Sequence, residues 1–201
     1  MDYKNKKQNQ CRCKYKLIQP KIILLVGMMG VGKSCLGRII SKRLGVPCLD
    51  SDQEIENMTG FTISELFARY GEQEFRRGEE RVMARLLDGK PCVLSSGGGS
   101  FLSEKTRKLA KEKTVSVWIK AEANVISGRT EGRTHRPLVP AADNQKAIER
   151  LVQECYPVYA QADITIPSYD ELPSKTAKRL MKVLLEQGIV QRNLPEKEDE
   201  K

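Results

Sequence analysis

The stretch from residue 21 to residue 44, KIILLVGMMGVGKSCLGRIISKRL, determines how the rest of the chain is interpreted. Residues 22–26 are apolar and largely branched, which is typical of a buried strand. Residues 27–34 follow as a glycine-rich turn. In residues 36–44 apolar side chains then recur at helical spacing, which predicts a helix. The stretch therefore predicts a strand, a loop and a helix in succession.

The turn itself, GMMGVGKS, matches the pattern G-x-x-x-x-G-K-[ST]. Between a strand and a helix, this pattern predicts a loop whose backbone N–H groups and helix N-terminus bind phosphate. The residues expected to contact ATP here are Gly30, Val31, Gly32, Lys33, Ser34 and Cys35. Lys33 is expected at the β- and γ-phosphates, and Ser34 at Mg²⁺. The alternative is an accidental glycine-rich turn, but a chance match is expected on the order of once per hundred chains of this length.

Strand-like and helix-like segments continue to alternate after the loop. Further short strands are predicted at residues 47–49, 92–94, 114–119 and 163–166. Alternation of this kind implies a parallel sheet with ligands at the carboxyl ends of its strands. The predicted fold class is α/β: a P-loop NTPase-like parallel sheet flanked by helices on both faces, with a mobile lid. One domain is expected over residues 21–190, between a disordered basic arm (1–20) and a charged tail (191–201).

The net charge of +9 is concentrated near the N-terminus. Residues 1–16 hold six cations and one acid, a net +5, which leaves +4 for the rest. We interpret this segment as a disordered arm, with nucleic-acid binding as the minority alternative. The segment lacks the apolar core of a secretory signal, and no apolar run approaches the roughly 20 residues of a membrane span. The expectation is a cytoplasmic protein with no nucleic-acid or membrane partner, its six scattered cysteines reduced and no zinc site.

Two carboxylates end the second predicted strand. Asp50 and Asp52 are two positions apart, so on a strand both would face the same side and could lie near the γ-phosphate. The alternative is that they only cap the helix that follows.

Three later segments also carry candidate site residues, and they are 71–80 (GEQEFRRGEE), 96–100 (SGGGS) and 136–138 (RPL). With the P-loop and the aspartate pair, they resemble the signature of the shikimate kinase family in order and spacing, from about Ile22 to about Leu185. The resemblance implies a kinase that uses ATP and Mg²⁺ to phosphorylate the 3-hydroxyl of shikimate, giving shikimate 3-phosphate and ADP. We also expect a monomer.

The resemblance implies a role for each matching residue. Asp52 would hold the acceptor hydroxyls and act as general base, while Asp50 would bind Mg²⁺, through water. Arg76 would bind the substrate carboxylate, with Glu79 close by. At helical i, i+3 spacing these last two could instead be a solvated ion pair.

The remaining roles fall on the glycine triplet and two arginines. Gly97, Gly98 and Gly99 would form a bare turn against the substrate ring, where the alternative is an ordinary strand-to-helix turn. Arg136 would reach the phosphates from a lid at about 130–144, completing a catalytic set with Lys33 and Asp52. Arg129 would pack on adenine. Without the resemblance, both arginines could be plain surface charge.

One position departs from the family pattern. Cys155 stands where the family usually has a second substrate-binding arginine, two residues before Pro157. The lost cation would weaken substrate binding about ten- to a hundredfold unless Arg150 or a lid arginine replaces it. Cys155 gives weight to one alternative, a kinase for another polyol acid such as gluconate. A separate alternative is a nucleotide-binding regulatory module that has lost catalysis.

Overall fold

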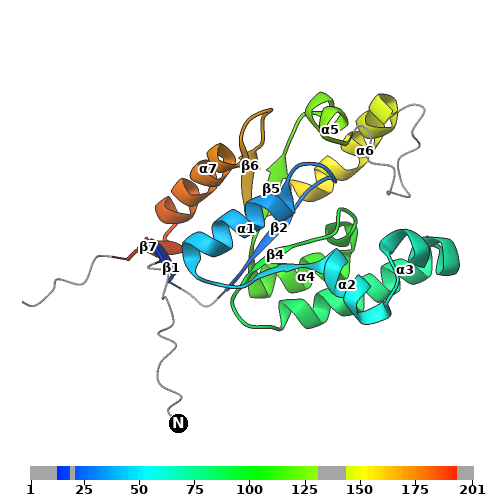
Figure 1. Ribbon diagram of the computed structural model, residues 1–201, viewed down its shortest axis with the longest axis horizontal. Helices are drawn as coiled ribbons and strands as arrows, with labels where there is room; N and C mark the ends of the chain where they lie inside the picture. Colours follow the sequence, from blue (N-terminus) through cyan, green and yellow to red (C-terminus); the bar gives the residue numbers. More distant parts are fainter. Residues whose placement is uncertain (1–12, 19–20, 131–143, 194–201) are drawn as a thin grey trace, which may run out of the picture.

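A computed structural model of the chain describes residues 13–18, 21–130 and 144–193. Its centre is β2 (Ile22–Val26), a strand buried along its whole length, followed by the glycine loop and by α1 (Lys33–Leu44). A five-stranded parallel sheet in the order β3-β4-β2-β5-β6 surrounds β2 (Figure 1). The predicted strand, loop and helix, and the α/β fold class, are confirmed.

The other elements follow the predicted alternation. They are β3 (Cys48–Asp50), α2 (Ser51–Thr59), α3 (Ile63–Leu87), β4 (Val93–Ser95), the 3₁₀ turn η1 (Ser100–Leu102), α4 (Glu104–Lys113), β5 (Thr114–Lys120), α5 (Ala123–Thr130), α6 (Asn144–Tyr159), β6 (Ile164–Pro167) and α7 (Pro173–Glu186). Each of the four further predicted strands is present, with bounds within one residue of those expected.

The strand order explains how helices reach both faces of the sheet. The chain passes from β2 through α1 toward β3 at one edge, whereas it passes from β4 through α4 to β5 in the opposite direction. Crossovers between parallel strands are right-handed, so α1 and α4 lie on opposite faces. The chain leaves β2 at the point where the strand order reverses, which is where ligands bind in open α/β sheets.

Two short strands correct the predicted domain bounds. Residues of β1 (Tyr15–Leu17), predicted to belong to a disordered arm, pair antiparallel with β7 (Val190–Arg192). Val190 is buried and Leu17 packs against the core, so apolar burial holds the pair in place. The folded domain therefore begins before residue 21 and ends after residue 190, which makes both predicted limits wrong. The arm up to residue 12, the tail from residue 194 and the predicted lid at 131–143 lie outside the described residues.

Helix α3 brings two site residues to the sheet. A capping box starts it, in which the Thr62 hydroxyl accepts from the Glu65 N–H and the Glu65 carboxylate accepts from the Thr62 N–H. Gly71 interrupts the helical dihedral angles with φ 74°, a left-handed value that favours glycine. The part of the helix after this kink carries Arg76 and Glu79. Within the described residues, no helix combines the length and the apolar composition needed to cross a membrane.

Candidate active site

The glycine loop wraps around the Lys33 side chain. Its ammonium donates to the Gly27 carbonyl at 2.8 Å and to the Met28 carbonyl at 2.9 Å. Gly27, Gly30 and Gly32 all have positive φ, at 133°, 76° and 95°. A Cβ on Gly27 would also lie only 2.7 Å from the Ile119 carbonyl oxygen on β5. The loop conformation therefore requires glycine, and it holds the Lys33 cation at the carboxyl end of β2.

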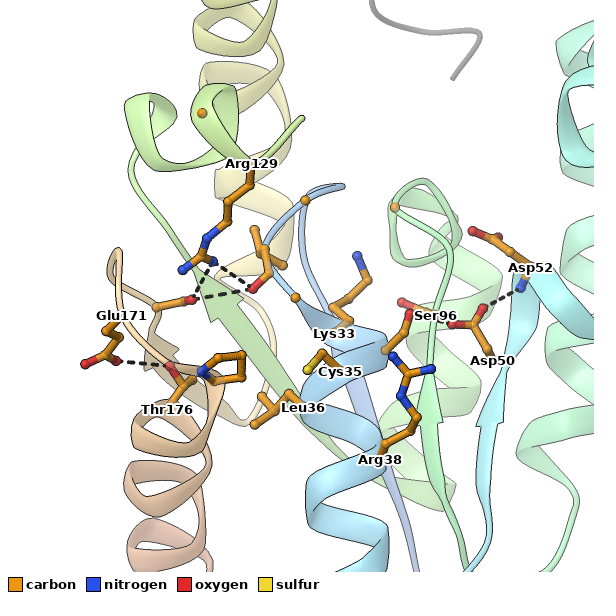
Figure 2. A pocket seen from close by; sticks show the side chains of 18 residues that line it. Lys33, Cys35, Leu36, Arg38, Asp50, Asp52, Ser96, Arg129, Glu171 and Thr176 are labelled. Carbon is orange, nitrogen blue, oxygen red and sulfur yellow. Dashed lines mark hydrogen bonds between the residues drawn. The ribbon is translucent and has the colours of Figure 1, made fainter. Parts of the chain in front are cut away.

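A pocket of about 690 Å³ opens over this loop (Figure 2). The predicted ATP-contacting residues of the loop all line it, and so do four other predicted site residues: Asp50, Asp52, Gly98 and Arg129. Figure 2 shows Lys33 between Arg129 on one side and the two aspartates on the other. Residues from four separate segments thus converge on one cavity.

Arg129 forms the wall opposite the aspartates. Its guanidinium donates to the Val31 carbonyl at 3.3 Å, to the Ser168 hydroxyl at 3.1 Å and to the Tyr169 carbonyl. These bonds tie α5 to the glycine loop and to the end of β6. Arg129 is therefore a pocket residue rather than free surface charge, while its stacking on adenine stays a prediction.

Asp50 combines the two roles considered from sequence. One carboxylate oxygen accepts from the Asp52 N–H at 3.1 Å and so caps α2, while the other accepts from the Ser34 hydroxyl at 2.6 Å. Two oxygen ligands thus meet beside the loop, which suits Mg²⁺, an ion usually held by one or two protein oxygens together with phosphates and water. Within the described part of the chain, no group of three or more His, Cys, Asp or Glu side chains could hold a metal. Ser34 and Asp50 could therefore supply two oxygen ligands to Mg²⁺ beside the loop.

Beyond Asp52 the pocket leads to the glycine triplet. The Gly97 N–H donates to the Ser51 hydroxyl at 2.8 Å, which ties the triplet to the residue between the two aspartates. A Cβ on Gly97 would lie 2.9 Å from Glu79 Oε1 and closer still to Asp52 Oδ1. The triplet is therefore in van der Waals contact with both acidic side chains, a close approach that only glycine permits.

Arg76 and Glu79 form a partly buried pair at this end of the site. Arg76 donates to Glu79 at 2.7 Å, and the Glu79 side chain is only 4% exposed. The alternative of a solvated ion pair is therefore wrong. Burial alone would lower the pKa of Arg76, but Glu79 and Glu72 outweigh it and raise that pKa above its ordinary value. A side chain on Gly99 would overlap the Arg76 guanidinium.

Cys155 lies on α6 and belongs to the buried hydrophobic core. Its side chain is buried, and burial together with Glu154 raises the pKa of its thiol, an effect that the nearby Arg76 cation opposes. Tyr159, one turn along α6, donates to the Gly98 carbonyl. Arg150, the alternative cation suggested by sequence, is exposed on α6. The position that departs from the family pattern therefore lies within electrostatic reach of Arg76.

Several residues that line the pocket or support the site were given no role from the sequence. Ser96 and Ser168 line the pocket just after β4 and β6, so polar residues at strand ends could have pointed to them. Ser51, Ser100 and Tyr159 support the triplet and the acidic side chains through bonds between distant segments. No local pattern marks these bonds. Arg136, predicted to be catalytic, lies outside the described residues.

The fold and the pocket define a P-loop protein of the small-molecule kinase class, with a phosphate-binding loop beside a second, acidic and glycine-lined region. The sequence profile described as shikimate kinase matches residues 29–185. The chain belongs to the shikimate kinase family.

Individual relatives agree with this assignment. A shikimate kinase of Paramagnetospirillum magneticum is 48% identical over 165 residues, which cover 82% of this chain and 85% of that protein. One of Bradyrhizobium diazoefficiens is 49% identical over 162 residues, covering 81% and 78% of the two chains. The structure of an Acinetobacter baumannii shikimate kinase in complex with shikimate is similar at a TM-score of 0.81 and 31% identity, covering 84% of this chain and 95% of that one.

Proposed function

We propose that this chain transfers the γ-phosphoryl group of ATP to the 3-hydroxyl of shikimate, giving shikimate 3-phosphate and ADP. The observation that carries the proposal is the arrangement of the pocket. Lys33 lies in the phosphate loop, and Asp52 lies in the same pocket where it meets a glycine-lined region. Among the described residues, that region contains the partly exposed cation Arg76, which suits a small anionic acceptor. The names of the relatives favour shikimate over gluconate.

In this proposal the phosphate loop positions the donor. Gly30, Val31, Gly32 and Cys35 surround the phosphates, and the Lys33 ammonium neutralises charge on the transferring group. Ser34 and Asp50 would hold Mg²⁺, Asp50 through water, and the bound ion would supply further charge neutralisation on the β- and γ-phosphates. Arg129 would contact the adenine. Arg136 would add a second cation when the lid at 130–144 closes and excludes water.

The acceptor would be held on the other side. Asp52 binds the reacting hydroxyl and takes its proton, while Arg76, with Glu79 beside it, binds the carboxylate. Gly97, Gly98 and Gly99 let the ring lie directly against the backbone, where a side chain would obstruct it. Both reactants are then oriented for in-line transfer, and this orientation supplies much of the rate acceleration.

Location, oligomeric state and partners of the enzyme are inferred as well. We infer a cytoplasmic monomer whose partners are ATP or ADP and shikimate, with no nucleic-acid or membrane partner. Nucleic-acid binding through the basic arm can be tested, because such binding would weaken steeply with salt and would vanish on removal of residues 1–12, which leaves β1 intact.

Coupled ADP release tests the proposed function. With ATP and Mg²⁺, shikimate should stimulate ADP release and gluconate should not, and Lys33→Met provides the inactive control. Stimulation by gluconate alone would indicate the polyol-acid kinase. ATP binding without release in response to either acid would indicate the regulatory module.

A further inference from the structure

Glu79 has two hydrogen-bond partners, Arg76 and Ser100, and the helical spacing of the sequence suggested only Arg76. Its Oε2 accepts from Arg76 at 2.7 Å, and its Oε1 accepts from the Ser100 hydroxyl at 2.6 Å. Ser100 is itself only 2% exposed. A buried carboxylate is costly unless it is paired and hydrogen-bonded, and here both oxygens are engaged. The Glu79 carboxylate is therefore fixed in rotation as well as in place.

Arg76 depends on this carboxylate for its direction. Its other polar partner, Glu72, is 3.3 Å away with a side chain that is 58% exposed, and exposed pairs of this kind contribute little. The rings of Phe67 and Phe75 lie 5.5 and 5.4 Å from the guanidinium carbon, contacts that attract a cation without fixing its fork. Glu79 is thus the directional partner that sets where the free N–H groups of Arg76 point.

Ser100 links the glycine triplet to Glu79, because it follows the triplet directly in the chain and donates to the Glu79 carboxylate. It begins η1 directly after Gly99, and Gly99 packs against the Arg76 guanidinium. A Cβ on Gly97 would lie 2.9 Å from Glu79 Oε1 and 3.1 Å from Ser100 Oγ, so the three groups are in mutual contact. The segment 97–100 therefore contacts both members of the Arg76–Glu79 pair.

We infer that Ser100 is a positioning residue for the acceptor: its hydrogen bond fixes Glu79, and Glu79 aims Arg76 at the acceptor carboxylate. The inference rests on the proposed function, in which Arg76 binds that carboxylate. It adds a residue that touches neither substrate and acts through the pair. Cys155 stands where the family usually has a second arginine. The orientation of Arg76 should therefore contribute more to the binding free energy of the acceptor here than it would with that arginine present.

The test compares Ser100→Ala with Ser100→Thr in the full-length chain. For Ser100→Ala, the shikimate KM should rise about tenfold, as expected for a lost hydrogen bond to a charged group. The kcat should change less than about threefold, and the ATP KM less than about twofold. Ser100→Thr keeps the hydroxyl and should return the shikimate KM to within about threefold of the native value.

Ser103→Ala is the matched control. Ser103 donates to Glu80 at 2.7 Å and caps α4, so its loss also removes a serine–glutamate bond, but one outside the pocket. This control should lower the Tm without moving the shikimate KM. If Ser100→Ala behaves in the same way, or fails to fold while Ser100→Thr folds and shows a KM shifted more than tenfold, Ser100 is only structural and the inference is overturned. If the native chain shows no shikimate-dependent ADP release, the proposed function itself fails, which is a separate result.

Discussion

Replacing Gly97 by alanine would place a methyl group between the two acidic side chains of the acceptor region. The new Cβ would lie 2.9 Å from Glu79 Oε1 and nearer still to Asp52 Oδ1, whereas ordinary contact begins at 3.4 Å. Asp52, the closer of the two, must therefore retreat by more than half an ångström. A misplacement of about 1 Å at a reacting group can cost on the order of a hundredfold in rate, so we expect kcat to fall by roughly that factor.

The same geometry indicates that the variant folds. The φ of Gly97 is outside the left-handed region, and the atoms that must move are the ends of side chains. We therefore expect native circular dichroism and an ATP KM within about twofold of the native value, while coupled ADP release with saturating shikimate reports the loss of kcat. Gly78→Ala is the control, because a methyl group there meets nothing within 4 Å and removes a helix-interior glycine, a gain of about 0.5–1 kcal/mol. Native kcat in Gly97→Ala would refute the placement of Asp52 at the reacting hydroxyl.

Three further variants test other parts of the site. Asp52→Asn should keep ATP affinity, measured by calorimetry, while turnover falls about 10²–10⁴-fold, and unchanged turnover would exclude Asp52 as the base. Lys33→Met should abolish transfer on an intact fold, because the phosphates lose their cation; near-native activity would contradict the phosphate-loop assignment. Cys155→Arg should lower the shikimate KM about ten- to a hundredfold and leave the ATP KM unchanged, with Cys155→Ser as the uncharged control. A raised KM in the arginine variant would mean that another cation already occupies the site.

Local sequence patterns predict much of the fold. The five consecutive buried residues of β2 and the loop that follows it are contiguous in sequence, so one short window predicts both the central strand and the phosphate site. The antiparallel pair of β1 and β7 was missed for the opposite reason. Its partners, such as Tyr15 and Arg192, lie at the two ends of the chain, and a three-residue strand carries too little periodicity to be recognised alone.

The candidate site divides in the same way. Asp50 and Asp52 could be predicted because Asp50 ends β3 and Asp52 lies in the first turn of the helix that follows, and in a parallel sheet the carboxyl ends of the strands face the ligand. The bonds from Ser51 to Gly97 and from Ser100 to Glu79 join segments 46 and 21 residues apart. Which hydroxyl meets which partner depends on how α2, α3 and the triplet pack together. That packing has no one-dimensional signal, so the supporting residues emerge only from the structure.

Cys155 raises the question of how an acceptor carboxylate is bound without the second arginine of the family pattern. The sequence indicates that a cation is missing, and the structure places Cys155 in the buried core on α6, near enough to Arg76 for its thiol to feel that cation, one turn before Tyr159, which donates to the triplet backbone. Because burial raises the pKa of the Cys155 thiol, the side chain stays neutral near pH 7 and adds no negative charge that would repel an anionic acceptor. In the proposed function, the described part of this region would attract the acceptor carboxylate through Arg76, which is paired with Glu79 at 2.7 Å. The affinity for shikimate should accordingly depend more on the Arg76–Glu79 pair than on the identity of any uncharged residue at position 155.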